Sequence, residues 1–72
     1  MSKKIQKISD KLTELHEELE TMAEEAQDIY DNRSERWQES EKGEEYEEMI
    51  SALEDAASSV QDAIDYLSDY AE

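Results

Sequence analysis

The chain has 72 residues and a mass of 8.4 kDa, enough for one small domain, and a domain of this size buries only about 60% of the surface that its unfolded chain exposes. Its 22 acidic and 7 basic residues give a net charge of −15, which disfavours direct binding to nucleic acid or to an anionic membrane. The absence of cysteine excludes disulfides and thiolate metal sites. A cytoplasmic location, which we expect, is compatible with this absence. No apolar run reaches the roughly 18 residues of a membrane span and the chain does not start with a signal-peptide segment, so we expect the mature form to be the whole chain.

The first half of the chain carries an unbroken heptad pattern, which is typical of an amphipathic helix. Apolar residues recur at alternating spacings of three and four. This regularity argues against a disordered acidic tail, which the composition alone would permit. We predict a first helix over residues 3–41. Its expected packing face consists of Ile5, Ile8, Leu12, Leu15, Leu19, Met22, Ala26 and Ile29.

The single glycine, Gly43, marks the predicted turn at residues 42–44. Glycine enters the left-handed conformation at the end of a helix without steric cost, and no other residue of this chain does so as readily. The alternative is a helix break at residues 31–34, where Asn32 or Ser34 is a candidate cap. In that case the segment around position 37 belongs to the connection.

A second amphipathic helix is predicted over residues 45–71, because its apolar residues repeat the alternating spacing. The two segments predict an all-α fold, an antiparallel two-helix coiled-coil hairpin formed by residues 1–72 as a single domain. The packing face of the second helix comprises Tyr46, Ile50, Leu53, Ala57, Val60, Ile64, Leu67 and Ala71, widened on one side by Met49, Ala56, Ala63 and Tyr70.

A turn at Gly43 would leave the start of the chain without a partner. With this turn, two residues lie opposite each other in the hairpin when their numbers sum to about 87. The second helix would therefore cover the first only back to about Leu15. Residues 1–14 would overhang, and their apolar edge would meet water unless a second copy covered it. Two helices alone also bury little surface. We therefore expect a homodimer, a helical bundle that associates through Ile5, Ile8, Leu12 and Leu15.

The predicted overhang is also the basic part of the chain. It holds four of the seven basic residues and has a charge of +3 over its first eleven positions, against −18 for the remainder. Cations at a helix N-terminus oppose the helix dipole. One interpretation is packing beside the acidic end of a second copy, at Asp62, Asp65, Asp69 and Glu72, and the alternative is a solvated basic end.

Carboxylates recur every seven residues on the outer face of each predicted helix. Residues 15–72 have a net charge of −17, about 0.4 per Å along a rod of about 42 Å, against about 0.6 per Å for duplex DNA. A groove that neutralises phosphates with Lys and Arg would attract such a surface. This indicates nucleic-acid mimicry, and the alternative is an acidic coiled coil kept soluble by its charge. The candidate partner-binding carboxylates are Glu17, Glu20, Glu24, Asp28, Asp31, Glu48, Asp55, Asp62, Asp65 and Asp69.

Aromatic and arginine residues concentrate near the predicted turn. Such residues dominate the hot spots of protein interfaces, so they are candidate partner contacts, and closure of the core under the turn is the alternative. Tyr66, on the polar side of the second helix near the C-terminus, is another candidate. The full set of candidate contacts is Tyr30, Arg33, Arg36, Trp37 and Tyr66.

The sequence offers little for catalysis or metal binding. His16 is the only histidine, on a polar flank, and one imidazole makes neither a zinc site nor a catalytic triad. General acid catalysis requires a carboxylic acid buried in a pocket, which a two-helix hairpin does not provide. No Asp-x-Asp-x-Asp-Gly calcium loop occurs, and a single glycine excludes a glycine-rich phosphate loop. We expect no enzymatic activity, no cofactor, no metal site, and a histidine at the surface.

The run of residues 33–44, Arg-Ser-Glu-Arg-Trp-Gln-Glu-Ser-Glu-Lys-Gly-Glu, is followed by an acidic heptad helix. In this the chain resembles small acidic helical proteins encoded by phages and prophages, over about half of its length. Such proteins include anti-restriction and anti-CRISPR inhibitors, several of which occupy the nucleic-acid groove of a host nuclease complex. The resemblance implies an inhibitor that binds the basic nucleic-acid groove of a host defence protein in the host cytoplasm.

Two other classes of function remain as alternatives. The first is a structural oligomerisation module, in which the heptad face is the functional surface and the acidic residues provide solubility. The second is a regulatory or chaperone-like adaptor that binds a partner helix through the edge formed by Ile5, Ile8 and Leu12.

Overall fold

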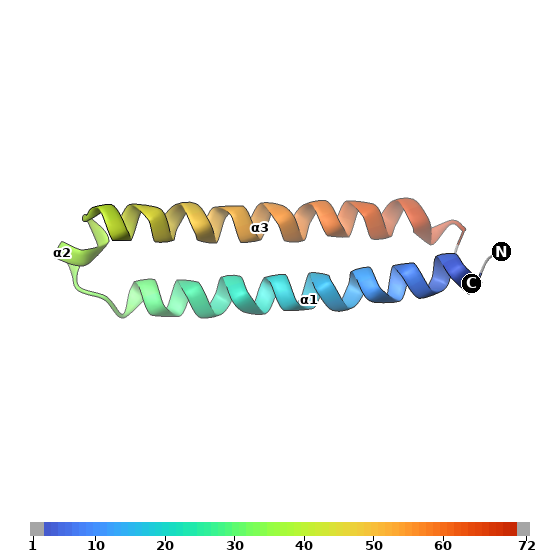
Figure 1. Ribbon diagram of the computed structural model, residues 1–72, viewed down its shortest axis with the longest axis horizontal. Helices are drawn as coiled ribbons and strands as arrows, with labels where there is room; N and C mark the ends of the chain where they lie inside the picture. The colour runs from blue at the N-terminus through green and yellow to red at the C-terminus, as the bar shows by residue number, and fades with distance from the viewer. Residues whose placement is uncertain (1–2, 71–72) are drawn as a thin grey trace.

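Two long helices joined by a short helical connection make up the hairpin that the computed structural model describes for residues 3–70 (Figure 1). Helix α1 spans Lys3–Asp31, α2 is a single turn at Glu35–Gln38, and α3 spans Glu41–Ser68. The long helices lie side by side in opposite directions, and the start of α1 and the end of α3 share one end of the rod (Figure 1). The prediction of an all-α fold with two long packed helices is confirmed.

Helix α1 ends ten residues earlier than predicted, so its expected continuation to residue 41 is wrong. The side chain of Asn32 donates a hydrogen bond to the Asp28 carbonyl (2.9 Å), which satisfies one of the free carbonyls at the helix end. Ser34 then caps α2, since its hydroxyl accepts a hydrogen bond from the backbone N–H of Trp37. The alternative break at residues 31–34 is therefore the one that the structure contains.

Gly43 lies in the first turn of α3, so the predicted turn at residues 42–44 is also wrong. Ser40 is the N-cap of α3 and accepts a hydrogen bond from the Gly43 N–H at 3.3 Å. The backbone of Gly43 does not have a positive φ. A Cβ atom at this position would lie only 2.2 Å from the Gln38 carbonyl oxygen and 2.4 Å from that of Trp37. Glycine is needed here because the connection passes against it.

The pairing register of the helices follows from the position of this connection. Tyr30 donates a hydrogen bond to Glu47, and His16 and Gln61 line the same groove between the helices; in both pairs the numbers sum to 77, whereas we predicted about 87. Helix α3 ends at Ser68 and therefore covers α1 from about residue 9 onwards, so the predicted overhang is wrong for residues 9–14. Positions 1, 2, 71 and 72, including the predicted helix end at 71, lie outside the described residues.

The corrected register places the basic start of α1 beside the acidic end of α3 in the same chain (Figure 1). Lys7 and Lys11 lie level with residues 66–70, because paired positions sum to about 77. The basic and the acidic part of one hairpin thus share one end of the rod, without a Lys–carboxylate ion pair among residues 3–70. This arrangement does not need the acidic end of a second copy, which was one of the two interpretations offered by the sequence.

The seam between the helices uses only part of the packing face expected on α1. Ile8, Leu15, Met22 and Ile29 were expected in it, but between 48 and 54% of their surface is exposed. The neighbouring positions Ser9, His16, Ala23 and Tyr30 are buried or half-buried in their place, together with Ile5, Leu12, Leu19 and Ala26.

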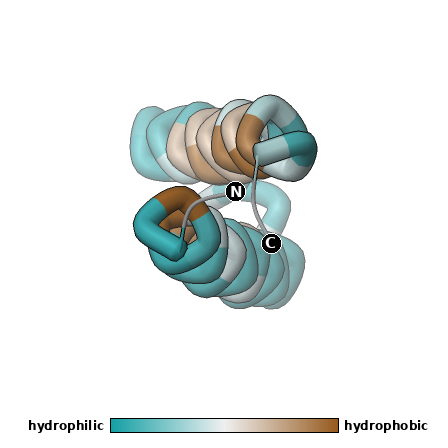
Figure 2. The backbone as a smooth tube through the Cα atoms, turned by 90° about the vertical axis from the view of Figure 1, so that its right-hand side faces the viewer, coloured by the Kyte–Doolittle hydropathy of each residue, from teal (hydrophilic) through white to brown (hydrophobic). Residues whose placement is uncertain are grey.

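On α3 the expected packing face is confirmed for the described residues. The buried or half-buried positions are Tyr46, Ile50, Leu53, Ala57, Val60, Ile64 and Leu67. Hydrophilic positions occupy the outer sides of both helices (Figure 2). The buried apolar core of the described chain nevertheless contains only four residues, and three of them are alanines: Ala23, Ala26, Ile50 and Ala57.

Candidate functional site

A groove of about 680 Å³ follows one side of the seam between α1 and α3. We call the side of the hairpin that carries it the polar face. Carboxylates, amides and alanines line the groove, and no Lys or Arg side chain does so. The lining residues are His16, Glu20, Ala23, Glu24, Gln27 and Asp28 from α1, and Glu54, Ala57, Ser58 and Gln61 from α3.

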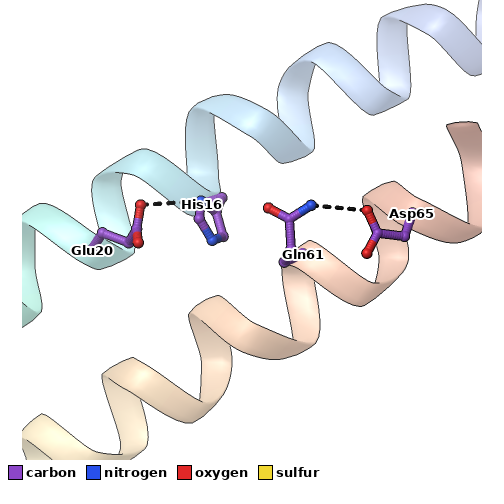
Figure 3. A network of polar contacts seen from close by, with 4 residues as sticks. All are labelled: His16, Glu20, Gln61 and Asp65. Carbon is purple, nitrogen blue, oxygen red and sulfur yellow. Dashed lines mark hydrogen bonds and ion pairs between the residues drawn. The ribbon is translucent and has the colours of Figure 1, made fainter.

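His16 and Gln61 project from the two helices into the space between them (Figure 3). The Nδ1 atom of His16 lies 3.3 Å from Oε1 of Glu20, and Gln61 donates a hydrogen bond to Asp65 at 3.0 Å. The side chain of His16 is only 18% exposed, so the expectation of a surface histidine is wrong. The reason is the shifted seam, which includes position 16 between Leu12 and Leu19.

The negative charge of the hairpin is not neutralised by basic side chains of the chain itself. Within residues 3–70 the contact between His16 and Glu20 is the only one between a basic side chain and a carboxylate, and no Lys or Arg is bridged to a carboxylate. Asp10, Asp31 and Asp65 accept hydrogen bonds from glutamine amides one turn away, which leave their charge in place. The field of these carboxylates is therefore directed into solvent.

The ten predicted partner-binding carboxylates are all exposed, but they do not share one face. Each acidic residue of the α3 stripe follows a seam residue by two positions, which is about 200° around the helix. This stripe therefore lies on the outer side of α3, away from α1: Glu48, Asp55, Asp62 and Asp69.

The structure brings a different set together at the polar groove, namely Glu20, Glu24 and Asp28 of α1 with Glu54 of α3. Glu17 and Asp31 lie on the same flank of α1, because each follows a seam residue by one position. Sequence reasoning missed Glu54, and also Glu47, which lines a smaller hollow next to it. Both lie beside the seam, and only the correct pairing register would have placed them opposite the acids of α1.

The aromatic residues near the connection pack against one another. The ring centroids of Tyr30 and Trp37 are 6.1 Å apart, and those of Trp37 and Tyr46 are 5.6 Å apart, both edge to face. The guanidinium of Arg33 lies 4.4 Å from the centroid of the Trp37 ring. Half-buried Trp37 thus closes the end of the hairpin, which was the alternative to a partner contact. The other candidate hot spots, Arg36 and Tyr66, are exposed, and Tyr66 is 77% exposed.

Tyr30 provides a pH-dependent contact between the helices. Its hydroxyl donates a hydrogen bond to the carboxylate of Glu47, and this bond raises the pKa of Tyr30 from 10.0 to about 12. Because the pKa in the folded chain is above that in the unfolded chain, the contribution to stability is complete below pH 10 and is lost as the pH rises towards 12.

We therefore expect the urea midpoint of unfolding, followed by circular dichroism, to fall over this pH interval. The fall should be smaller in Tyr30→Phe, which lacks the hydroxyl but keeps the ring. An equal fall in both chains would show that the bond to Glu47 does not contribute.

Residues 3–70 contain neither a membrane-spanning helix nor a metal-binding cluster. No helix there combines the length and apolar character needed to cross a membrane, and no group of three or more His, Asp or Glu side chains there is arranged to hold a metal ion. Comparison with protein-family models, with curated proteins and with solved structures found no match to the chain.

Proposed function

We propose that this protein inhibits a basic, nucleic-acid-binding protein by occupying its groove, as a mimic of nucleic-acid charge. In this proposal the hairpin is an antiparallel coiled coil that presents its polar face to the target, a CRISPR or restriction nuclease complex in the host cytoplasm. The observation that carries the proposal is the run of Glu20, Glu24, Asp28 and Glu54 along one groove, without a Lys or Arg partner among the described residues.

The shape and charge density of the rod support this proposal. Its Cα atoms span 54 × 14 × 12 Å, and two helices with side chains make a rod about 20 Å wide, comparable to a nucleic-acid duplex. A net charge of −15 along 54 Å is about 0.3 per Å, half of the roughly 0.6 per Å of duplex DNA. The four lysines near the start of α1 leave most of the negative charge on the rest of the rod.

The stability of the hairpin does not explain why it carries so many unpaired carboxylates. Like charges on adjacent turns of a helix destabilise it by a few tenths of a kcal/mol per pair, and a small domain is well served by a net charge of about 2 to 8. A basic groove would gain fast association from this surface, with a strong dependence on salt.

Capture experiments with two matched variants test the proposal. The bait is immobilised chain, and the sample is the heparin-binding fraction of a bacterial lysate, which is enriched in nucleic-acid-binding proteins. The outer-side variant, Glu48→Gln, Asp55→Asn, Asp62→Asn and Asp69→Asn, removes as many charges as the polar-face variant, which is Glu20→Gln, Glu24→Gln, Asp28→Asn and Glu54→Gln.

We expect the wild type and the outer-side variant to retain a protein that salt releases and that duplex DNA competes away. The polar-face variant should bind it about tenfold or more weakly, since electrostatic steering alone changes association rates by about 10- to 1,000-fold. Equal helicity of the three chains by circular dichroism is the control. Equal retention by both variants would contradict a role for the polar face.

The second candidate is the structural oligomerisation module, favoured by the half-exposed apolar residues Ile8, Leu15, Met22 and Ile29. In that case the acidic surface serves solubility alone. Both charge variants would then retain the same proteins as the wild type, or only further copies of the chain.

A further inference from the structure

The four exposed apolar residues of α1 form one stripe, because they recur every seven residues at Ile8, Leu15, Met22 and Ile29. We call them the α1 stripe. Isolated apolar residues on a surface are ordinary, but half-exposed apolar residues that recur on one side of a helix indicate an interaction surface. We propose that a second copy of this chain covers the α1 stripe, with α1 of each copy packed against α3 of the other. The position of the stripe on the hairpin and its match to α3 support this proposal.

The α1 stripe lies on the side of the hairpin opposite to the polar face. Met22 follows the groove residue Glu20 by two positions, which is about 200° around α1. On α3, Ala56 follows the groove residue Glu54 by the same step. Both helices therefore turn apolar positions towards the same side, which we call the apolar face.

On α3 the apolar face is a row without charge. Its residues follow one another at alternating spacings of three and four: Met49, Ala52, Ala56, Ser59, Ala63, Tyr66 and Tyr70. All of them are exposed or half-buried in the single hairpin. We call this the uncharged row. In a chain with 22 acidic residues, a row free of carboxylates from residue 49 to residue 70 fits a surface that is covered by apolar side chains.

The α1 stripe and the uncharged row match in register and in size. If a two-fold axis runs along the rod, every residue keeps its height, so α1 of one copy meets α3 of the other at positions that sum to about 77, as within the hairpin. Leu15 then lies opposite Ala63, and Met22 opposite Ala56. In the middle of the rod large side chains of one copy thus meet small side chains of the other, which is how well-packed cores interlock, while near its ends Ile8 meets Tyr70 and Ile29 meets Met49.

The charges beside the stripe also fit this arrangement. Lys11, Glu18 and Glu25 flank the α1 stripe, and at the same heights they meet Tyr66, Ser59 and Ala52 of the second copy, none of which is charged. Pairing α1 with α1 instead would centre the stripe on position 18 and place two copies of Glu18 against each other. Like charges at such a contact are destabilising.

The surface area is sufficient for a stable dimer. The hairpin exposes 5,660 Å², whereas a compact protein of its mass exposes about 4,600 Å². Two hairpins expose twice 5,660 Å², and a compact protein of the combined mass about 7,600 Å², so association can bury up to about 3,700 Å². Stable interfaces bury about 1,600 Å². A second copy would also give the chain the core that four buried apolar residues do not provide.

The mass in solution tests this proposal. Sedimentation equilibrium across a micromolar concentration range should give twice 8.4 kDa for the wild type. The double variant Leu15→Glu with Met22→Glu should halve this mass, because it buries four carboxylates at the contact. Thr13→Glu with Gln27→Glu adds the same charge to α1 away from the apolar face and should remain a dimer. A wild-type mass of 8.4 kDa at every concentration would overturn the proposal.

Mixed disulfides test which helices meet, without removing the stripe. A mixture of Leu15→Cys chains and Ala63→Cys chains should form a cross-linked dimer on mild oxidation. A mixture of Leu15→Cys and Met22→Cys chains reports the alternative contact of α1 with α1 and should not. Cross-linking of the second mixture instead of the first would overturn the proposed arrangement.

The dimer does not rest on the proposed groove-binding function, because the two surfaces lie on opposite sides of the hairpin. The polar-face variant should stay dimeric, and the variant Leu15→Glu with Met22→Glu keeps every polar-face carboxylate. Loss of one property without the other therefore identifies which of the two proposals has failed.

Discussion

Replacing Gly43 with alanine is expected to destabilise the hairpin by about 1–3 kcal/mol, the usual cost of forcing extra atoms into a filled space. Alanine is the better helix former by about 1 kcal/mol, so helix propensity alone predicts the opposite sign. The steric term wins because the new Cβ would lie 2.2 Å from the Gln38 carbonyl oxygen and 2.4 Å from that of Trp37. These are backbone atoms, and they can move only if the connection shifts away from α3.

Urea unfolding followed by circular dichroism measures this effect. Glu44→Ala, at the exposed neighbouring position, is the control and should change stability by less than about 0.5 kcal/mol. Gly43→Asn separates the two explanations for the glycine. Asparagine tolerates the left-handed conformation, so it would be milder than alanine if Gly43 formed a turn. Because the close approach limits size, we expect asparagine to be worse, and the reverse order would contradict this explanation.

Replacing Trp37 with alanine is expected to lower the free energy of unfolding by about 2–3 kcal/mol. The change removes two edge-to-face ring pairs, each contributing about 0.5–1.5 kcal/mol, and the contact with the Arg33 guanidinium, about 0.5–1 kcal/mol. The geometry of all three contacts is favourable, with centroid distances of 5.6 and 6.1 Å and the guanidinium at 4.4 Å.

Trp37→Phe should lose less stability than Trp37→Ala, because it keeps a ring between Tyr30 and Tyr46. Arg36→Ala serves as a control, since Arg36 is exposed and adjacent in sequence. Urea denaturation at neutral pH measures all three variants. If Trp37→Ala unfolded at the same urea concentration as the wild type but lost a binding partner, Trp37 would be an interface residue and not the closure of the hairpin.

The two long amphipathic helices could be predicted from periodicity, but the connection could not be predicted from the glycine. Two signals competed there, a glycine that permits a turn and two serines that cap helices. The serines determine the structure, because Ser34 and Ser40 each satisfy a free N–H at a helix start. The error of ten in the pairing sum, and with it the predicted overhang, follows from that one choice.

The face of α1 shows a second limit of the sequence. The apolar arc of α1 is wider than one partner helix can cover. Periodicity gives the width of this arc, but it does not tell which half of the arc faces α3. The structure uses the half that includes Ser9 and His16, and it leaves Leu15 and Met22 exposed. Polar residues in the seam give no periodic signal. The acidic groove could not be predicted either, because Glu54 lies opposite the acidic residues of α1 only in the correct pairing register.

Displacement of duplex DNA is the most direct test of the central claim, that the polar face occupies a nucleic-acid groove. The captured protein is bound to labelled duplex DNA, and the hairpin or one of its charge variants is added over a salt series. We predict that wild type and outer-side variant release the DNA, that more hairpin is needed as salt rises, and that the polar-face variant releases it poorly. A stable complex of hairpin, protein and DNA together, or equal release by both variants, would contradict the claim.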